Sequence, residues 1–235
     1  MRLLLLSNST TDQGYLVHAA DWLRDFLGEE VQRVLFVPFA AVTFSFDDYA
    51  TKVSEAFEPL GYAVDSIHQM PDTARAVREA QAIAVGGGNT FRLLSRLYRL
   101  GLLDLIRKRV RDGLPYMGWS AGANLACPTI RTTNDMPIIQ PPSFDALDLI
   151  PFQINPHYTD AHPPGHKGET RADRLREFIE LNPEMPVLGM PEGTALRVED
   201  DHLDRLGAHA LRLFQHGEDI REVADTDLSA LLAAA

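Results

Sequence analysis

The sequence has one cysteine, no long apolar run and relatively little positive charge. With Cys127 alone, the chain can form neither an internal disulfide nor a cysteine-rich zinc site. No stretch approaches the ~20 apolar residues of a membrane span, and the apolar start at residues 1–6 is too short for the core of a signal peptide. We therefore expect a cytoplasmic protein that does not act at a membrane.

The shortage of positive charge bears on the choice of partner. Against 33 Asp and Glu residues the chain has 22 Lys and Arg residues, which gives a net charge of −11. Proteins that bind nucleic acids draw most of their affinity from clustered Lys and Arg, and here the basic residues are scattered. We therefore expect no nucleic-acid partner.

Short apolar runs alternate with helical patterns along most of the chain, an order typical of βαβ units around a parallel sheet. The expected strands are residues 3–6, 34–37, 63–67, 82–85, 115–118 and 187–190. The expected helices are residues 15–27, 72–80, 90–100, 102–110 and 170–181. The runs at 194–198, 203–206 and 211–214 indicate a small antiparallel C-terminal appendix. The predicted fold class is α/β, a mostly parallel sheet with helices on both faces.

The alternation stops between Cys127 and Gly168, where the chain has eight prolines and few helical patterns. A loop of this length in a compact domain is usually functional or disordered. Because the segment also carries Asp135 and His157, we expect it to be functional.

Residues 118–122 read Gly-Trp-Ser-Ala-Gly, a G-x-S-x-G pattern between an expected strand and a short helix. In a nucleophile elbow, small residues let the backbone turn sharply and hold the serine hydroxyl near a helix N-terminus. Ser120 is therefore a candidate nucleophile. The alternative is a tight glycine turn with an incidental serine.

A second glycine turn, Gly86-Gly87-Gly88-Asn89-Thr90, follows another apolar run. Its amides suit either a phosphate group or the oxyanion of an acyl-transfer reaction, and a turn needed only for packing is the third alternative. The spacing is neither G-x-G-x-x-G nor G-K-[ST], which disfavours nucleotide binding. We expect no cofactor.

A serine nucleophile needs a base, and the chain has eight histidines. His157 follows the apolar residues 152–154, and Pro156 stiffens its approach, so it is placed to project from a strand end. His157, His162 and His166 together suggest a metal site. No HExxH motif or cysteine accompanies them, so we expect no metal.

Long blocks of the sequence resemble the peptidase E family, the aspartyl dipeptidases among serine peptidases. They run in order from residue 1 to about 193, and the resemblance fades after about residue 198. The blocks are LLLLSNS (3–9), VGGGNT (85–90), GWSAGANLAC (118–127), PTIRTTNDMP (128–137), FDALDL (144–149), QINPH (153–157), GHKGETR (165–171) and PEG (191–193).

The resemblance implies a flavodoxin-like fold related to class I glutamine amidotransferases, in one hydrolytic domain over residues 1–235 with a divergent appendix at 199–235. It also implies that the substrate is a small acidic dipeptide with an N-terminal aspartate. In such a fold the elbow carries the nucleophile, here Ser120. Cys127 lies off the elbow and is expected to be a packing residue.

Carried over by position, the resemblance makes Ser120 the nucleophile and His157 the general base, with Gly88 and Ala121 as the oxyanion amides. Two acids match the family pattern for the group that orients the histidine, Asp135 and Glu192. A carboxylate at the carboxyl end of a strand is the firmer scaffold, which favours Glu192. Asp135 stays open because serine triads recur with different chain orders.

An aspartyl substrate needs a cation for its side chain and an anion for its free amine. Arg171 is the expected cation, because a guanidinium matches a carboxylate bidentately. Arg131 and Lys167 are second choices, and the alternative for Arg171 is a surface ion pair with a neighbouring acid. Glu169 is the candidate for the amine, and Asn89 is a further candidate substrate contact.

Two other functions stay open at this point. The same Ser120 and His157 suit a serine hydrolase of different specificity, and the fold suits a catalytically silent amidotransferase-like binding module. The apolar Phe44 and Phe46 fit either a homodimer surface or a cap over the core.

Overall fold

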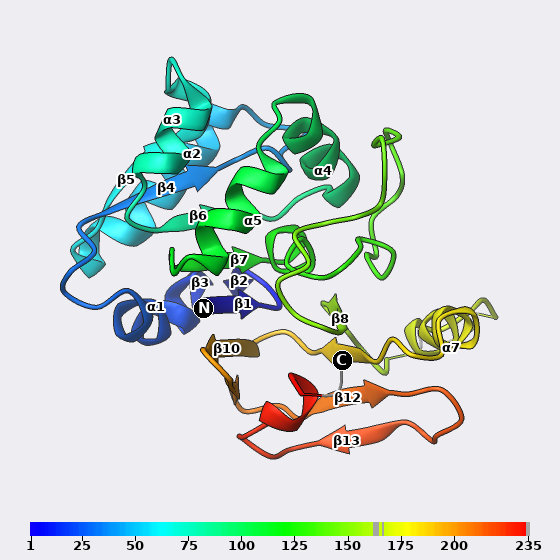
Figure 1. The fold of residues 1–235 in the computed structure, drawn as a ribbon. Helices are drawn as coiled ribbons and strands as arrows, with labels where there is room; N and C mark the ends of the chain where they lie inside the picture. Colours follow the sequence, from blue (N-terminus) through cyan, green and yellow to red (C-terminus); the bar gives the residue numbers. More distant parts are fainter. Residues whose placement is uncertain (162–164, 166, 234–235) are drawn as a thin grey trace.

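The strands form a large sheet, a smaller one and the two-stranded pair β2-β3 in the computed structural model, which describes residues 1–161, 165 and 167–233 (Figure 1). In the described chain the order of the large sheet is β11-β10-β1-β7-β6-β4-β5, and that of the smaller sheet is β13-β12-β9-β8. The strands are β1 (Arg2–Leu6), β2 (Thr10–Thr11), β3 (Gly14–Tyr15), β4 (Arg33–Val37), β5 (Ala63–Ser66), β6 (Ile83–Val85), β7 (Tyr116–Trp119), β8 (Gln153–Pro156), β9 (Val187–Met190), β10 (Ala195–Glu199), β11 (His202–Leu206), β12 (Leu211–Phe214) and β13 (Arg221–Val223).

The helices lie on both faces of the large sheet, as predicted. The α-helices are α1 (Ala20–Leu27), α2 (Phe46–Phe57), α3 (Thr73–Glu79), α4 (Thr90–Arg99), α5 (Leu103–Arg111), α6 (Ala121–Asn124) and α7 (Arg171–Leu181). Because successive side chains of a strand point to opposite faces, Leu3 and Leu5 of β1 join the core formed with α3, α4 and α5. Leu4 and Leu6 join the core formed with α1 and α2.

The centre of the large sheet is parallel, which confirms the predicted class. Strands β1, β7, β6, β4 and β5 all run in the same direction. The C-terminal antiparallel strands are also present, but they are shared between the two sheets. Strands β10 and β11 extend the large sheet beside β1, whereas β12 and β13 pair beside β9 in the smaller sheet.

The smaller sheet is packed against α7. Leu175 and Ile179 of the helix contact a cluster that includes Tyr158, Val187 and Phe214. Figure 1 shows α7 at the side of the smaller sheet. The helix connects the parallel strands β8 and β9 and contacts residues of both β9 and β12.

Several elements differ from the sequence prediction, among them the short strands β2, β3 and β13, which were not predicted. The helix expected over residues 15–27 begins only at Ala20, because Leu16 has a left-handed φ of 57° and a short 3-10 turn precedes the helix. Helix α2 was not predicted, although Ser45 caps it and its apolar residues recur at helical spacing. Strand β8 lies inside the proline-rich segment; it was not among the expected strands, but it confirms that His157 follows the end of a strand.

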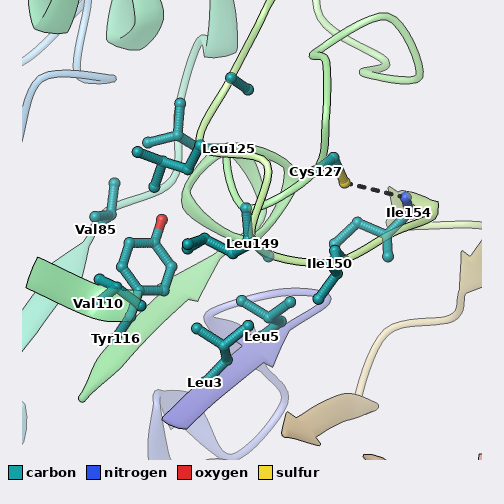
Figure 2. Close-up of a cluster of buried hydrophobic side chains, with 14 of the residues drawn as sticks. Leu3, Leu5, Val85, Val110, Tyr116, Leu125, Cys127, Leu149, Ile150 and Ile154 are labelled. Carbon is teal, nitrogen blue, oxygen red and sulfur yellow. Dashed lines mark hydrogen bonds between the residues drawn. The ribbon is translucent and has the colours of Figure 1, made fainter. Parts of the chain in front are cut away.

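Cys127 is a packing residue, as expected. Its side chain is fully buried in the main core, and its sulfur accepts a hydrogen bond from the amide of Ile154 in β8 at 3.3 Å (Figure 2). Burial raises the pKa of the Cys127 thiol to about 12.

We expect the thiol of Cys127 to be inert in the native protein. With a pKa of about 12, its thiolate fraction at pH 8 is only about 10⁻⁴, and the sulfur has no access to solvent. Titration with dithiobis-nitrobenzoate would measure this. We expect no reaction before unfolding and one thiol per chain in guanidinium; fast reaction of the native protein would contradict the burial.

Candidate active site

The candidate residues follow the carboxyl ends of parallel strands from both sheets. Ser7, the residues 86–88 and Ser120 follow β1, β6 and β7 of the large sheet. His157 follows β8 and Glu192 lies two residues beyond β9, both in the smaller sheet. The carboxyl ends of parallel strands are where α/β folds form ligand sites, so the two sheets bring these residues to one place.

Ser120 stands on a sharp turn between β7 and α6. Its φ and ψ are 53° and −112°, a backbone conformation that non-glycine residues rarely adopt. The turn is held by the Ser120 amide, which donates to the carbonyl of Leu6 at 3.0 Å, and by the Ser120 carbonyl, which accepts from the amide of Asn124. The predicted elbow is present, with its serine at the N-terminus of α6.

The two glycines of the G-x-S-x-G pattern are required by close packing. A Cβ on Gly118 would lie 2.3 Å from the carbonyl oxygen of Gly122, and one on Gly122 would lie 2.0 Å from that of Val85. Because backbone atoms cannot be displaced like the end of a side chain, neither position admits a larger residue at this spacing. The glycines let β6, β7 and α6 approach closely enough to form the elbow.

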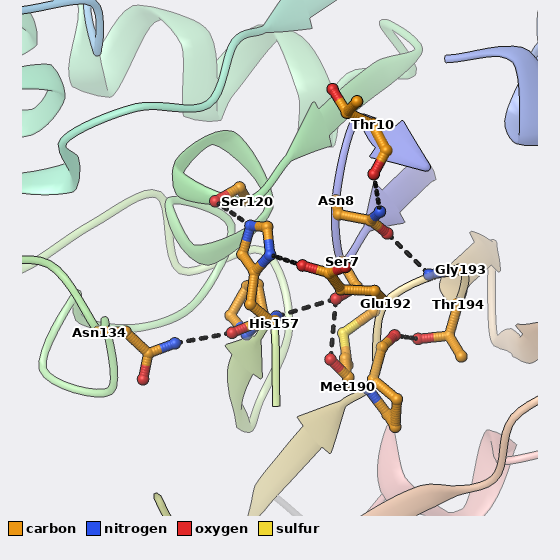
Figure 3. Close-up of polar contacts among 12 residues, drawn as sticks. Ser7, Asn8, Thr10, Ser120, Asn134, His157, Met190, Glu192, Gly193 and Thr194 are labelled. Carbon is orange, nitrogen blue, oxygen red and sulfur yellow. Dashed lines mark hydrogen bonds and ion pairs between the residues drawn. The ribbon is translucent and has the colours of Figure 1, made fainter. Parts of the chain in front are cut away.

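His157 lies between Ser120 and Glu192. Its Nε2 is 3.0 Å from Oγ of Ser120, and its Nδ1 is 2.7 Å from Oε1 of Glu192 (Figure 3). The side chains of His157 and Glu192 are 38% and 61% exposed, so the solvent screens their attraction and the carboxylate acts mainly to orient the ring. The arrangement suits proton transfer from the serine hydroxyl to the imidazole.

Asp135 occupies a different place from Glu192. Its Oδ2 accepts hydrogen bonds from the amide and hydroxyl of Thr90 and from the hydroxyl of Thr133, at 2.7, 2.5 and 3.1 Å. It therefore lies at the N-terminus of α4, and no contact with His157 is found within the described residues. Of the two acids that the sequence left open, only Glu192 contacts the imidazole.

The sequence did not identify Ser7, which holds the backbone of His157. The buried hydroxyl of Ser7 accepts a hydrogen bond from the amide of His157 at 2.9 Å and donates one to the carbonyl of Met190 at 2.8 Å (Figure 3). Asn134 adds a hydrogen bond from its side-chain amide to the carbonyl of Pro156. These contacts fix His157, whose own φ is 55°.

The turn that carries Glu192 is held by Asn8, another residue that the sequence did not single out. The buried side chain of Asn8 accepts from the amide of Gly193 at 2.7 Å and donates to the carbonyl of Thr10 at 2.7 Å (Figure 3). In the sequence, Ser7 lies 150 residues from His157 and Asn8 lies 185 residues from Gly193, so no local pattern reveals these two contacts.

The predicted oxyanion amides, those of Gly88 and Ala121, lie near the serine and have no hydrogen-bond acceptor within the described residues. Gly88 has a φ of 133° and passes so close to Ala40 that a Cβ would meet its carbonyl oxygen at 2.4 Å. On the neighbouring Gly87, a Cβ would lie 3.1 Å from Cβ of Ser120. The glycine turn therefore lies against the elbow.

The three predicted substrate contacts have different surroundings. Arg171, the first residue of α7, is half-buried and makes no hydrogen bond or ion pair within the described residues. Burial and the positive charge of nearby Arg174 lower the pKa of Arg171, whereas the negative charge of Asp135 raises it. Arg171 is therefore close enough to Asp135 for the two charges to interact. Glu169 pairs with Arg174 at 3.7 Å. Asn89 caps α4 and donates to the carbonyl of Met136, so its side chain is occupied structurally.

Two hollows open on either side of the Ser120–His157 pair, and among the described residues only these two line both. The first is lined by Thr90, Ser120, Ala121, Asn124, Thr133, Asn134, Asp135, Pro156 and His157. The second is lined by Ser9, Tyr15, Phe44, Asp48, Tyr49, Lys52, Gly87, Gly88, Ser120 and His157. The Ser120–His157 pair therefore lies where the two hollows meet.

The expected histidine-rich stretch is only partly described, since His162 and His166 lie outside the described residues. Within the part of the chain that the structure covers, no group of three His, Cys, Asp or Glu side chains is placed to hold a metal ion. Among the same residues, no helix has the length and apolar character needed to cross a bilayer.

Removal of the Ser7 hydroxyl is expected to disturb His157. In Ser7→Ala the His157 amide loses its acceptor and the ring is less firmly placed, so labelling of Ser120 by a fluorophosphonate should slow by about tenfold or more. Ser66→Ala is the matched control, because it removes a buried hydroxyl that bonds His68 at the far edge of the large sheet. Equal labelling rates in both variants would contradict the role of Ser7.

Known proteins are similar to this chain in sequence and in fold. The sequence matches peptidase family S51 over residues 3–206. It is 53% identical over 235 residues to a protein from Streptomyces coelicolor named peptidase E, with 99% of this chain and 95% of that protein covered. It is 50% identical over 222 residues to a peptidase E from Nostoc sp., with 94% and 92% covered.

Solved structures support the same fold. A peptidase from an acI-B1 Actinobacterium superposes with a TM-score of 0.69 at 16% identity and covers 96% of this chain and 95% of its own. A crystal structure from Listeria monocytogenes superposes with a TM-score of 0.67 at 24% identity and covers 88% and 98%. Since the family match spans residues 3–206 and both sequence relatives align over nearly their whole length, the chain belongs to peptidase family S51.

Proposed function

We propose that the protein is a serine dipeptidase that hydrolyses dipeptides with an N-terminal aspartate through an acyl-enzyme on Ser120. The observation that carries the proposal is the continuous contact from Oγ of Ser120 through the His157 ring to Glu192. The relatives named peptidase E, at 50% and 53% identity, support the same activity.

In the first step Oγ of Ser120 attacks the carbonyl carbon of the aspartyl residue. Nε2 of His157 takes the hydroxyl proton during the attack and returns it to the leaving amine. Glu192 accepts a hydrogen bond from Nδ1, which fixes the tautomer in which Nε2 is the base and stabilises the imidazolium. Water then repeats the cycle on the ester and releases aspartate.

We assign the stabilisation of the oxyanion of the tetrahedral intermediate to the backbone amides of Gly88 and Ala121, which donate hydrogen bonds to it. Both lie beside Ser120, and neither has an acceptor within the described chain. Preorganised donors of this kind contribute about 3–4 kcal/mol each to transition-state stabilisation in serine peptidases. Ala121 is also the first residue of α6, where a helix N-terminus leaves amides free.

The aspartyl end of the substrate is assigned to the Asp135 side of Ser120. Arg171 pairs with the substrate's side-chain carboxylate, because its guanidinium is half-buried and no acid occupies it among the described residues. We assign the α-ammonium to Asp135 in preference to Glu169. Asp135 lines the hollow on this side, and its Oδ1 has no donor within the described residues, whereas Glu169 pairs with Arg174.

Two other functions are tested by the same measurements. A serine hydrolase of different specificity would use the same Ser120 and His157 but prefer other substrates. A silent binding module would show no reaction of Ser120 with a fluorophosphonate. The contact of 3.0 Å between Ser120 and His157 favours an active hydrolase over the binding module.

Three features of the whole chain belong to the same proposal. Residues 1–235 form one hydrolytic domain, in keeping with a main core that includes Leu3 of the large sheet and Leu188 of the smaller one. Two copies associate as a homodimer, which the exposed apolar side chains of Met136 and Ile138 beside the site support. The protein acts in the cytoplasm, in keeping with a single free cysteine.

Catalytic variants are expected to separate the two acids. On Asp-p-nitroanilide, Ser120→Ala should abolish turnover, and Glu192→Gln should lower kcat by up to about 10⁴-fold because the imidazole loses its orienting partner. Asp135→Asn should mainly raise KM. Steady-state kinetics measure both constants, and a larger kcat loss in Asp135→Asn than in Glu192→Gln would overturn the assignment.

Specificity for aspartate is expected to depend on Arg171. Wild-type kcat/KM for Asp-Leu should exceed that for Asn-Leu by up to about 10⁴-fold, since a neutral side chain leaves the guanidinium unpaired, and Glu-Leu should also be poor. Arg171→Met should remove most of this preference. Arg176→Met, which removes an exposed charge paired with Asp173 on the same helix, is the control. Equal wild-type rates on the three dipeptides would contradict the aspartyl specificity.

A further inference from the structure

The hollow on the other side of Ser120 and His157 has no role in the assignments above. It is formed between α2, β3 and the glycine turn after β6, and its volume is about 560 Å³, against about 30 Å³ on the Asp135 side. Gly88, whose amide is assigned to the oxyanion, lies in its wall. The hollow is therefore continuous with the reacting atoms.

Three aromatic side chains form much of its wall. Tyr49 is buried and fixed, because its hydroxyl donates to the carbonyl of Gly87 at 3.1 Å and accepts from the indole of Trp119 at 3.0 Å. The exposed ring of Phe44 packs edge-on against Tyr49 at 5.1 Å. Burial raises the pKa of both Tyr15 and Tyr49, so neither phenol ionises at neutral pH. Such walls suit an apolar side chain.

One cation stands in this aromatic wall. The ammonium of Lys52 lies over the ring of Tyr15, 4.3 Å from its centroid, and has no acidic partner at ion-pair distance within the described residues. The nearby Asp48 also lines the hollow, but its carboxylate accepts a hydrogen bond from the hydroxyl of Ser45 at 2.7 Å in the cap of α2. Lys52 is thus placed by the ring and open to an anion.

The direction of the substrate follows from the proposed function. If the aspartyl residue occupies the side of Arg171 and Asp135, the scissile carbonyl lies at Ser120 and the second residue extends to the opposite side. In a dipeptide that second residue ends in a free carboxylate. A cation about one residue beyond the scissile bond is the group needed to recognise such an end.

We propose that this hollow, lined by Tyr15, Phe44, Tyr49 and Lys52, is the leaving-group pocket and that Lys52 binds the C-terminal carboxylate of the dipeptide. The proposal rests on the proposed function and adds a residue that restricts substrate length. A tripeptide places an amide where the carboxylate belongs and leaves Lys52 unpaired. The aromatic walls favour an apolar second residue over a charged one.

The test compares Asp-Leu with Asp-Leu-amide, which lacks the terminal charge. The wild type should have a KM for Asp-Leu about three- to tenfold lower than for the amide, the range of a solvent-accessible ion pair supported by an aromatic face. Lys52→Met keeps the length of the side chain against Tyr15 but removes its charge. It should raise KM for Asp-Leu to the value of the amide and leave kcat and the KM of the amide nearly unchanged.

Two further variants separate charge recognition from folding and from net charge. Lys52→Arg should retain most of the preference, because it restores a cation at the same place. Lys108→Met removes an exposed lysine paired with Asp112 on α5 and should behave as wild type. An unchanged preference in Lys52→Met, or the same change in Lys108→Met, would overturn the role of Lys52.

The outcome is distinguishable from failure of the proposed function. Asp-p-nitroanilide has no terminal carboxylate and reports acylation of Ser120 alone. If the wild type hydrolyses it but shows no preference between Asp-Leu and its amide, the leaving-group pocket is wrong and the dipeptidase chemistry stands. If none of the three substrates is hydrolysed, the proposed function itself fails.

Discussion

The site depends on how the two sheets are joined, because its members come from both. Ser120 belongs to the large sheet, whereas His157 and Glu192 follow β8 and β9 of the smaller one. A shift of one sheet against the other would break the 3.0 Å contact between serine and imidazole while leaving each sheet intact. The structure therefore concentrates buried polar contacts along this junction.

Those contacts run from the elbow and from β1 into the smaller sheet. The side-chain amide of Asn124, in the elbow helix, donates to the carbonyl of Ile154 at 2.9 Å, and Cys127 accepts from the amide of the same residue. Ser7 bridges His157 and Met190 on the other side. Each bond is individually worth about 1 kcal/mol, but an unpaired buried partner costs more, so the junction has few alternative arrangements.

Local sequence patterns predicted the parts of the fold that local physics determines. The apolar runs of the central strands and the glycines around Ser120 act over a few residues, and the structure confirms them. Helix α2 was not predicted, although Tyr49, Val53 and Phe57 are buried along it at helical spacing. In the structure Phe46 packs on Phe39, which caps the core, and Phe44 lies at the rim of the second hollow.

The site was predictable only in part, for the same reason. The G-x-S-x-G pattern and the resemblance pointed to Ser120 and His157, but spacing did not choose between Asp135 and Glu192, because both follow from contacts made across the chain. Ser7, Asn8 and Lys52 carried no local signal. Their roles depend on the distant residues that the fold places next to them.

The backbone of Ser120 has a consequence for how the protein is studied. Its φ of 53° lies in a region that non-glycine residues rarely adopt, and such a conformation costs on the order of 1–3 kcal/mol. Alanine at this position keeps the Cβ and its restriction on the backbone, whereas glycine adopts a positive φ freely and leaves the turn less restricted. Ser120→Ala is therefore the inactive variant best suited to holding an uncleaved peptide at the site.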